Sequence, residues 1–279
     1  MKRFTIFAVI MLFLSVNVFA TKRALVIGLG KQQDSIHWNK INGDNDVKKY
    51  VIPMLNNCGY RGHIKSLVNS QATKKNIVDA FKTLTGQCKS GDIVYIHFSG
   101  HGQRVVDKND TKRESWVPYD AYYKYCNKDK GDKHLMEYEI NGLLHKIVNK
   151  IGSRGKLLVV VDACCSGGST RGDDDVDEDE DDAVARWAKD EFKLPSALLP
   201  KEDLKSKWIA LYACKPYEKA WEISDFKVGK LSYAIYNVAD KGRVEFPKIE
   251  KFMLNYRNRL TQTPYVKSDC SYNIWDVLK

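Results

Sequence analysis

Two stretches decide the fold of this chain: IVYIHFSGHG at residues 93–102 and LLVVVDACCSGG at residues 157–168. Each begins with a short, apolar, largely β-branched run, which is typical of a strand buried on both faces of a parallel sheet. Small and polar residues follow each run, with His101 after the first and Cys164 after the second. Because function in open α/β sheets collects at the carboxyl ends of strands, we expect these two side chains to share one rim. A thiol beside an imidazole there indicates nucleophilic catalysis by cysteine.

The remaining chain predicts alternating strands and helices. Strands are expected at residues 23–28 and 208–213, and helices at 46–55, at 72–81 with Thr73 as a cap, and at 139–148, 231–239 and 246–260. This alternation predicts an α/β fold, with a mainly parallel β-sheet covered by helices on both faces.

The first twenty residues are expected to be a secretory signal peptide. Lys2 and Arg3 precede an apolar stretch from Phe4 to Leu14, and small residues near Ala20 suit cleavage. An uncleaved anchor is the alternative, although the apolar stretch is short for a membrane span. We therefore expect an exported protein, periplasmic or secreted, with no stable membrane span after residues 1–20 are removed.

Charge and cysteine content argue against several classes of protein. The formal net charge of +10 comes from scattered lysines without the aromatic interleaving of a nucleic-acid reader, so no nucleic-acid partner is expected. The seven cysteines are odd in number and irregularly spaced, so at least one should stay unpaired. No Cys-x-x-Cys pair occurs, which leaves a structural zinc site with little support.

An acidic run, Asp173–Asp182, interrupts the regular pattern. Self-repulsion and a lack of apolar residues predict a mobile loop unless a cation is bound. The run lacks the glycine of an EF-hand loop, so we expect no dedicated calcium cage, and loose calcium binding stays open. No other metal site and no required cofactor are predicted.

The chemistry of peptide hydrolysis can be assigned to the two strand ends. It needs a thiolate, an imidazole that protonates the leaving amine, and backbone donors for the oxyanion. We predict Cys164 as the nucleophile, His101 as the acid and base, and the N–H groups of Gly102 and Cys164 as the oxyanion donors.

These motifs resemble those of caspase-like cysteine peptidases, and they are closer to metacaspases and bacterial orthocaspases of peptidase family C14 than to animal caspases. Ser99-Gly100-His101-Gly102 resembles the family's histidine motif, and Asp162-Ala163-Cys164-x-Ser166-Gly167 resembles its nucleophile motif. Weaker similarities, within a match over nearly all of residues 22–270, are Asn45-Asp46, Pro118-Tyr119-Asp120, Ala220-Trp221-Glu222 and Gln262-Thr263-Pro264. The resemblance implies a caspase-like, mainly parallel sheet sandwiched between helices.

The resemblance also implies a Cys-His dyad without a third residue and a specificity pocket floored by two acidic residues, Asp46 and Asp162. A carboxylate pair favours Arg or Lys immediately before the scissile bond. The chain departs from the family at Cys165, where His or another non-cysteine residue is usual. Cys165 is expected to face away from the site, because neighbouring side chains in an extended segment point to opposite sides.

Activation by cleavage between a large and a small part is a further implication. One peptidase domain at 21–279 would contain a large part at 21–171, an acidic linker loop at 172–206 and a small part at 207–279. Self-cleavage is expected at Arg171 or Arg186, or at the nearby Lys189 or Lys193, with calcium as a gate.

The sequence thus predicts an exported cysteine endopeptidase that acts on peptide or protein substrates after Arg or Lys. The alternative is an inactive interaction protein that keeps the fold and docks through its acidic loop.

Overall fold

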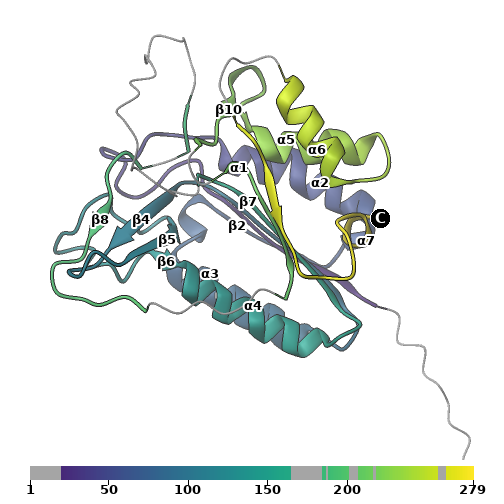
Figure 1. Ribbon diagram of the computed structural model, residues 1–279, viewed down its shortest axis with the longest axis horizontal. Helices are drawn as coiled ribbons and strands as arrows, with labels where there is room; N and C mark the ends of the chain where they lie inside the picture. The colour runs from purple at the N-terminus through teal and green to yellow at the C-terminus, as the bar shows by residue number, and fades with distance from the viewer. Residues whose placement is uncertain (1–19, 165–183, 187, 201–206, 216–217, 257–261) are drawn as a thin grey trace, which may run out of the picture.

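A six-stranded sheet forms the centre of the computed structural model, which describes residues 20–164, 184–186, 188–200, 207–215, 218–256 and 262–279 (Figure 1). The strand order is β12-β9-β7-β3-β1-β2. Their bounds are β1 Lys22–Gly28, β2 Ile64–Val68, β3 Ile93–Ser99, β7 Lys156–Asp162, β9 Ile209–Tyr212 and β12 Tyr265–Lys267. Strand β12 runs antiparallel to β9, and the other neighbours run parallel. The predicted α/β fold with a mainly parallel sheet is confirmed.

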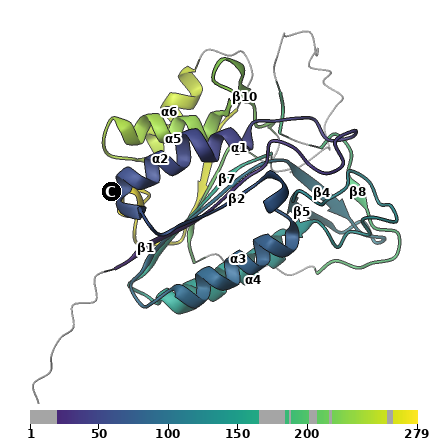
Figure 2. The ribbon, with the colours of Figure 1, turned by 180° about the vertical axis from the view of Figure 1, so that it is seen from behind.

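Helices cover both faces of this sheet (Figures 1 and 2). One face carries α3 (Lys74–Gln87) and α4 (Glu137–Ile151). The other carries α5 (Lys230–Asp240), α6 (Phe246–Asn255) and a helical stretch built from α1 (Gly43–Asn45), η1 (Asp46–Val51), α2 (Ile52–Leu55) and η2 (Asn56–Tyr60). Shorter turns are η3 (Asn69–Gln71), η4 (Ser224–Phe226) and α7 (Trp275–Leu278).

The apolar runs explain this layering. In β1, Ala24 and Val26 pack into the core under α5 and α6, whereas Leu25 and Ile27 pack into the core under α3 and α4. Successive side chains of a strand point to opposite faces, so a strand covered on both faces must be apolar throughout. The continuous runs in the sequence therefore mark the central strands.

Local signals set the helix ends. The Thr73 hydroxyl accepts a hydrogen bond from the backbone N–H of Asn76 at 3.2 Å, which caps α3 as predicted. Gly152 ends α4 with a φ of 66°, a conformation that glycine adopts without strain. No helix among the described residues is long and apolar enough to span a membrane.

Two smaller sheets break the expected alternation. The first has the order β6-β5-β4-β8, with β4 Gly102–Val106, β5 Lys112–Trp116, β6 Leu135–Met136 and β8 Phe192–Lys193. The second pairs β10 Glu222–Ile223 with β11 Val228–Gly229. Sequence patterning missed these strands because they bury polar side chains such as Gln103, Arg104 and Arg113, so no apolar run marks them.

Candidate active site

Parallel pairing brings His101 and Cys164 to the same edge of the sheet. Strands β3 and β7 are neighbours, with Ser99 opposite Asp162, and each of the two residues follows two positions later. Gly102 packs against the backbone of Cys164 so closely that a Cβ at Gly102 would collide with the Cys164 carbonyl oxygen. The side chains of His101 and Cys164 are both buried.

The His101 ring is held by a backbone carbonyl. Its Nε2 lies 2.8 Å from the carbonyl oxygen of Asn39, which can only accept, so Nε2 carries the proton of the neutral ring. Its Nδ1 has no hydrogen-bond partner among the described residues. Burial lowers the pKa of His101 to about 4, although the hydrogen bond to Asn39 opposes this. The neutral ring therefore has a basic nitrogen available.

The Cys164 thiol lies against a second segment of the site. Its Sγ accepts a hydrogen bond from the backbone N–H of Ala220 at 3.0 Å. Ala220 begins the Ala-Trp-Glu sequence that leads into β10, so the C-terminal part of the chain contacts the thiol directly.

Arg186 itself crosses this site as an extended peptide. Its carbonyl oxygen accepts hydrogen bonds from the N–H groups of Gly102 and Cys164, each at 3.3 Å, and these are the two groups that the sequence predicted as oxyanion donors. Its own N–H donates to the Ala220 carbonyl at 2.9 Å, and Ala188 N–H donates to the Gly102 carbonyl at 3.2 Å. Backbone contacts thus hold the chain on both sides of Arg186.

The Arg186 side chain fills an acidic pocket. Its Nη2 lies 2.7 Å from Asp46 Oδ2, and its Nη1 lies 3.4 Å from Asp162 Oδ1. The structure thus brings together both carboxylates that the sequence predicted for this pocket. Glu222 is a third, with Oε1 2.9 Å from Nη2, and the Ser99 hydroxyl accepts from Nη1 at 2.5 Å.

Sequence reasoning missed Glu222 and Ser99 as pocket residues. Both lie in stretches that resemble motifs of the family, Ala220-Trp221-Glu222 and Ser99-Gly100-His101-Gly102. A charged residue directly after Ala-Trp was the available signal for Glu222.

Charge balance in the pocket requires a cation. Burial raises the pKa of Asp46 to about 6, while the Arg186 guanidinium pulls it down and the Asp162 carboxylate pushes it up. Burial acts against the charge on Arg186, but the three carboxylates outweigh it and raise the Arg186 pKa above its ordinary value. At pH 7 the pocket is an anionic cavity with one guanidinium inside it.

A buried relay holds Asp162 in place. Asp162 Oδ2 accepts from the backbone N–H of Ser232 at 2.7 Å and from its hydroxyl at 2.6 Å. That hydroxyl lies 3.2 Å from His97 Nε2, and His97 Nδ1 lies 3.0 Å from the Tyr95 hydroxyl. Burial lowers the pKa of His97 to about 4, so His97 serves as a neutral core residue.

Several predicted features lie outside the described residues: Cys165, Arg171, the acidic run 173–182, most of the linker 172–206, and residues 1–19. Lys189 and Lys193 are described, and both are exposed. Among the described residues, no group of three or more His, Cys, Asp or Glu side chains could hold a metal ion.

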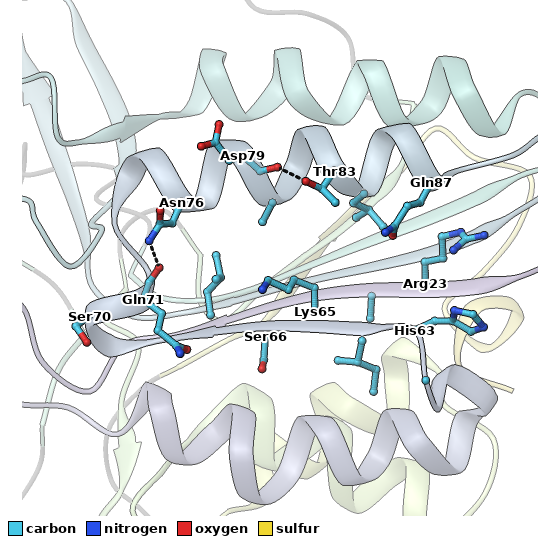
Figure 3. Close-up of a pocket in the computed structure, with 16 residues that line it drawn as sticks. Arg23, His63, Lys65, Ser66, Ser70, Gln71, Asn76, Asp79, Thr83 and Gln87 are labelled. Carbon is cyan, nitrogen blue, oxygen red and sulfur yellow. Dashed lines mark hydrogen bonds between the residues drawn. The ribbon is translucent and has the colours of Figure 1, made fainter.

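A separate groove of about 970 Å³ lies between β2 and α3 (Figure 3). Its lining includes His63, Lys65 and Gln87, and none of the predicted site residues belongs to it.

Several known proteins are similar to this chain in sequence. A family model described as "Metacaspase, peptidase C14 domain" matches residues 22–171. Metacaspase-1 of Candida albicans is 28% identical over 163 residues, which are 53% of this chain and 34% of that protein. Metacaspase-3 of Trypanosoma cruzi is 29% identical over 165 residues, 53% of this chain and 41% of that protein. The match therefore spans less than half the length of these relatives.

Solved structures share the fold. Caspase-1 from Spodoptera frugiperda has a TM-score of 0.58 at 11% identity and covers 92% of each chain. A protein from Geobacter sulfurreducens has a TM-score of 0.62 at 19% identity, covering 93% of this chain and 97% of its own.

Proposed function

The chain belongs to the metacaspase family of C14 peptidases, and we propose that it is a cysteine endopeptidase that cleaves peptide or protein substrates after Arg or Lys. One observation carries the proposal. The carbonyl oxygen of Arg186 lies on the N–H groups of Gly102 and Cys164, while its guanidinium lies among Asp46, Asp162 and Glu222. A substrate with a basic residue before the scissile bond would use the same contacts.

The reaction follows from these positions. His101 Nδ1 takes the proton of the Cys164 thiol, and the thiolate attacks the carbonyl carbon to form a tetrahedral intermediate. The N–H groups of Gly102 and Cys164 stabilise the oxyanion. His101 then gives the proton to the leaving amine, and a water molecule, deprotonated by His101, hydrolyses the thioester. Only protein groups and water take part.

The first substrate in this proposal is the chain itself. Arg186 is bound as a substrate residue would be, so cleavage after Arg186 frees residues 184–186 to leave the pocket. The chain beyond the cut stays held, because Phe192–Lys193 forms β8 beside β4 and Phe192 is fully buried. Arg171 stays a second proposed site of self-cleavage.

Mass spectrometry of the intact protein and hydrolysis of an Arg peptide test this function together. We expect wild type to yield two pieces that separate after Arg186 under denaturing conditions and migrate together under native conditions, because β9 lies inside the central sheet. Cys164→Ala should stay uncut and lose at least about a thousandfold in kcat/KM. Cys165→Ala is the matched control and should retain activity.

Full activity in Cys164→Ala, or loss of activity in Cys165→Ala alone, would assign the nucleophile to the neighbouring cysteine. An active wild type that remains one uncut chain would remove self-cleavage from the proposal.

The same measurements test two further proposals. Export with removal of residues 1–20 predicts a mass that begins at Thr21, whose N–H already bonds Asp92 Oδ1 at 3.0 Å. A chain exported with residues 1–20 intact would indicate the uncleaved anchor. Calcium gating by the acidic run predicts slower self-cleavage in the presence of EDTA, and an unchanged rate would argue against it.

A further inference from the structure

We propose that Glu222 makes the specificity pocket select arginine over lysine. This inference rests on the proposed function, since it concerns the residue that the enzyme accepts before the scissile bond. Neither the carboxylate pair predicted from the sequence nor the family match distinguishes the two basic residues.

Glu222 accepts hydrogen bonds from a donor pair that arginine has and lysine lacks. Its Oε1 accepts from Arg186 Nη2 at 2.9 Å and from Nε at 3.2 Å, which is the side edge of the guanidinium plane. The far end of the guanidinium is left to Asp46, Asp162 and Ser99. All five N–H donors of the arginine therefore have acceptors.

Lysine cannot satisfy the same set of acceptors. Its ammonium is a compact charge with three donors and no Nε–H part-way along the side chain. An ammonium that reaches Asp46 and Asp162 leaves Glu222 Oε1 without the two donors, Nε–H and Nη2–H, that Arg186 supplies to it. Leaving a buried carboxylate incompletely paired costs binding free energy.

Contacts that do not involve Arg186 also hold the carboxylate of Glu222. Its Oε1 accepts from the backbone N–H of Asn42 at 2.6 Å, and its Oε2 accepts from the Asn42 side-chain amide. Its backbone is pinned in β10, opposite Gly229 of β11. A side chain that cannot move toward a lysine ammonium discriminates against it.

Gly229, the β11 partner of Glu222, leaves no room for a side chain beside the guanidinium. A Cβ on Gly229 would collide with the Arg186 guanidinium and with Asp162 Oδ2. The backbone of Gly229 therefore lies directly against the guanidinium, and its N–H donates to Asp46 Oδ1 at 2.9 Å. The guanidinium thus packs directly against the Gly229 backbone, while Glu222 pairs with its Nε–Nη2 edge.

The first test compares matched peptides that differ only in Arg or Lys before the scissile bond. We expect wild type to prefer Arg by about tenfold or more in kcat/KM. Glu222→Gln should lower the Arg value far more than the Lys value, so that the preference shrinks at least about tenfold. Glu222→Asp keeps the charge on a shorter side chain, so its preference for Arg should lie between those of wild type and Glu222→Gln. Glu245→Gln, at a partly exposed glutamate immediately before α6, is the matched control and should keep the wild-type ratio.

The second test needs no catalysis, so it separates this inference from the proposed function. In the uncleavable Cys164→Ala chain, Arg186→Lys and Glu222→Gln form a double-mutant cycle measured by urea unfolding. Arg186→Lys should lower the folding equilibrium constant in both backgrounds. We expect the factor to be at least about tenfold larger when Glu222 is present than when Gln replaces it, a coupling free energy of about 1.4 kcal/mol.

A zero coupling in the cycle, or an equal loss of Arg and Lys hydrolysis in Glu222→Gln, would overturn the inference. A chain that hydrolyses neither peptide would refute the proposed function, while the cycle would still decide which cation the pocket prefers.

Discussion

At the scale of single residues, the site is built from close backbone approaches as much as from reactive side chains. Gly102 brings its N–H to the Arg186 carbonyl and its Cα against the Cys164 carbonyl oxygen. Any side chain at Gly102 would push these two strand ends apart, although its backbone conformation needs no glycine.

Gly102→Ala should therefore reduce activity strongly. The added methyl collides with the Cys164 carbonyl and displaces an oxyanion donor, so we expect kcat/KM to fall by about a hundredfold or more. Gly142→Ala is the matched control, because its Cβ would meet no atom within 4 Å and should stabilise α4 by about 0.5–1 kcal/mol. Peptide hydrolysis and urea unfolding measure the two effects. Normal activity in Gly102→Ala would show that this N–H does not stabilise the oxyanion.

At the scale of elements, caps and registers carry the site residues into place. Helix α3 packs Ile77, Phe81 and Leu84 against the sheet face that includes Phe98 of β3, the strand that delivers His101. Its start is determined locally by Thr73, whose side chain accepts from Asn76 N–H.

Thr73→Ala should lower the free energy of unfolding by about 1 kcal/mol, because the first turn of α3 loses its cap. Thr83→Ala, within the same helix, is the control. Its hydroxyl bonds the Asp79 carbonyl, which is already part of the helix, so we expect no comparable loss. Urea unfolding in the Cys164→Ala background gives both values, and equal losses would mean that the hydroxyl of Thr73 does not cap α3.

At the scale of the whole molecule, the Arg186 pocket ties together parts of the chain that are far apart. Asp46 comes from the first helical stretch, Asp162 from the central sheet and Glu222 from the C-terminal part. Breaking one buried partner of such a cluster costs several kcal/mol, about 3–5. The uncut chain is therefore held closed over its own site.

Global stability should fall on acidification. The pKa values of His97 and His101 are lowered from 6.5 to about 4, so between these pH values the unfolded chain binds more protons and the free energy of unfolding decreases as pH falls. Asp46, whose pKa is raised to about 6, has the opposite effect between about pH 6 and 3.8, because the folded chain then binds the proton more readily. This one carboxyl group offsets only part of the effect of the two imidazoles. We expect a net loss of stability from about pH 6.5 to 4.

His97→Gln removes one group that binds a proton only in the unfolded chain. The slope of the unfolding free energy against pH should therefore become shallower by up to about 1.4 kcal/mol per pH unit. The exposed His63→Gln is the matched control for the loss of one histidine. Urea unfolding of the uncleavable chain between pH 4 and 7 provides the measurement. The same slope in wild type and His97→Gln would contradict a neutral His97 in the core.

The central strands, most helix positions and the residues at the two strand ends could be predicted from the sequence alone. Burial on both faces forces continuous apolar runs, and caps such as Thr73 act within one turn, so both leave local signals. The strands β4, β5 and β10 leave none, because they bury polar side chains among the apolar ones and so show no continuous apolar run.

Only the tertiary structure decided that Arg186 occupies the pocket, that Glu222 grips its side edge and that Asn42 orients Glu222. These contacts join residues 24 to 180 positions apart. Pairing between distant polar groups depends on where the chain returns in space, and it has no period or composition that a sequence could display. The sequence thus determined which chemical groups the strand ends carry, and the fold determined what they hold.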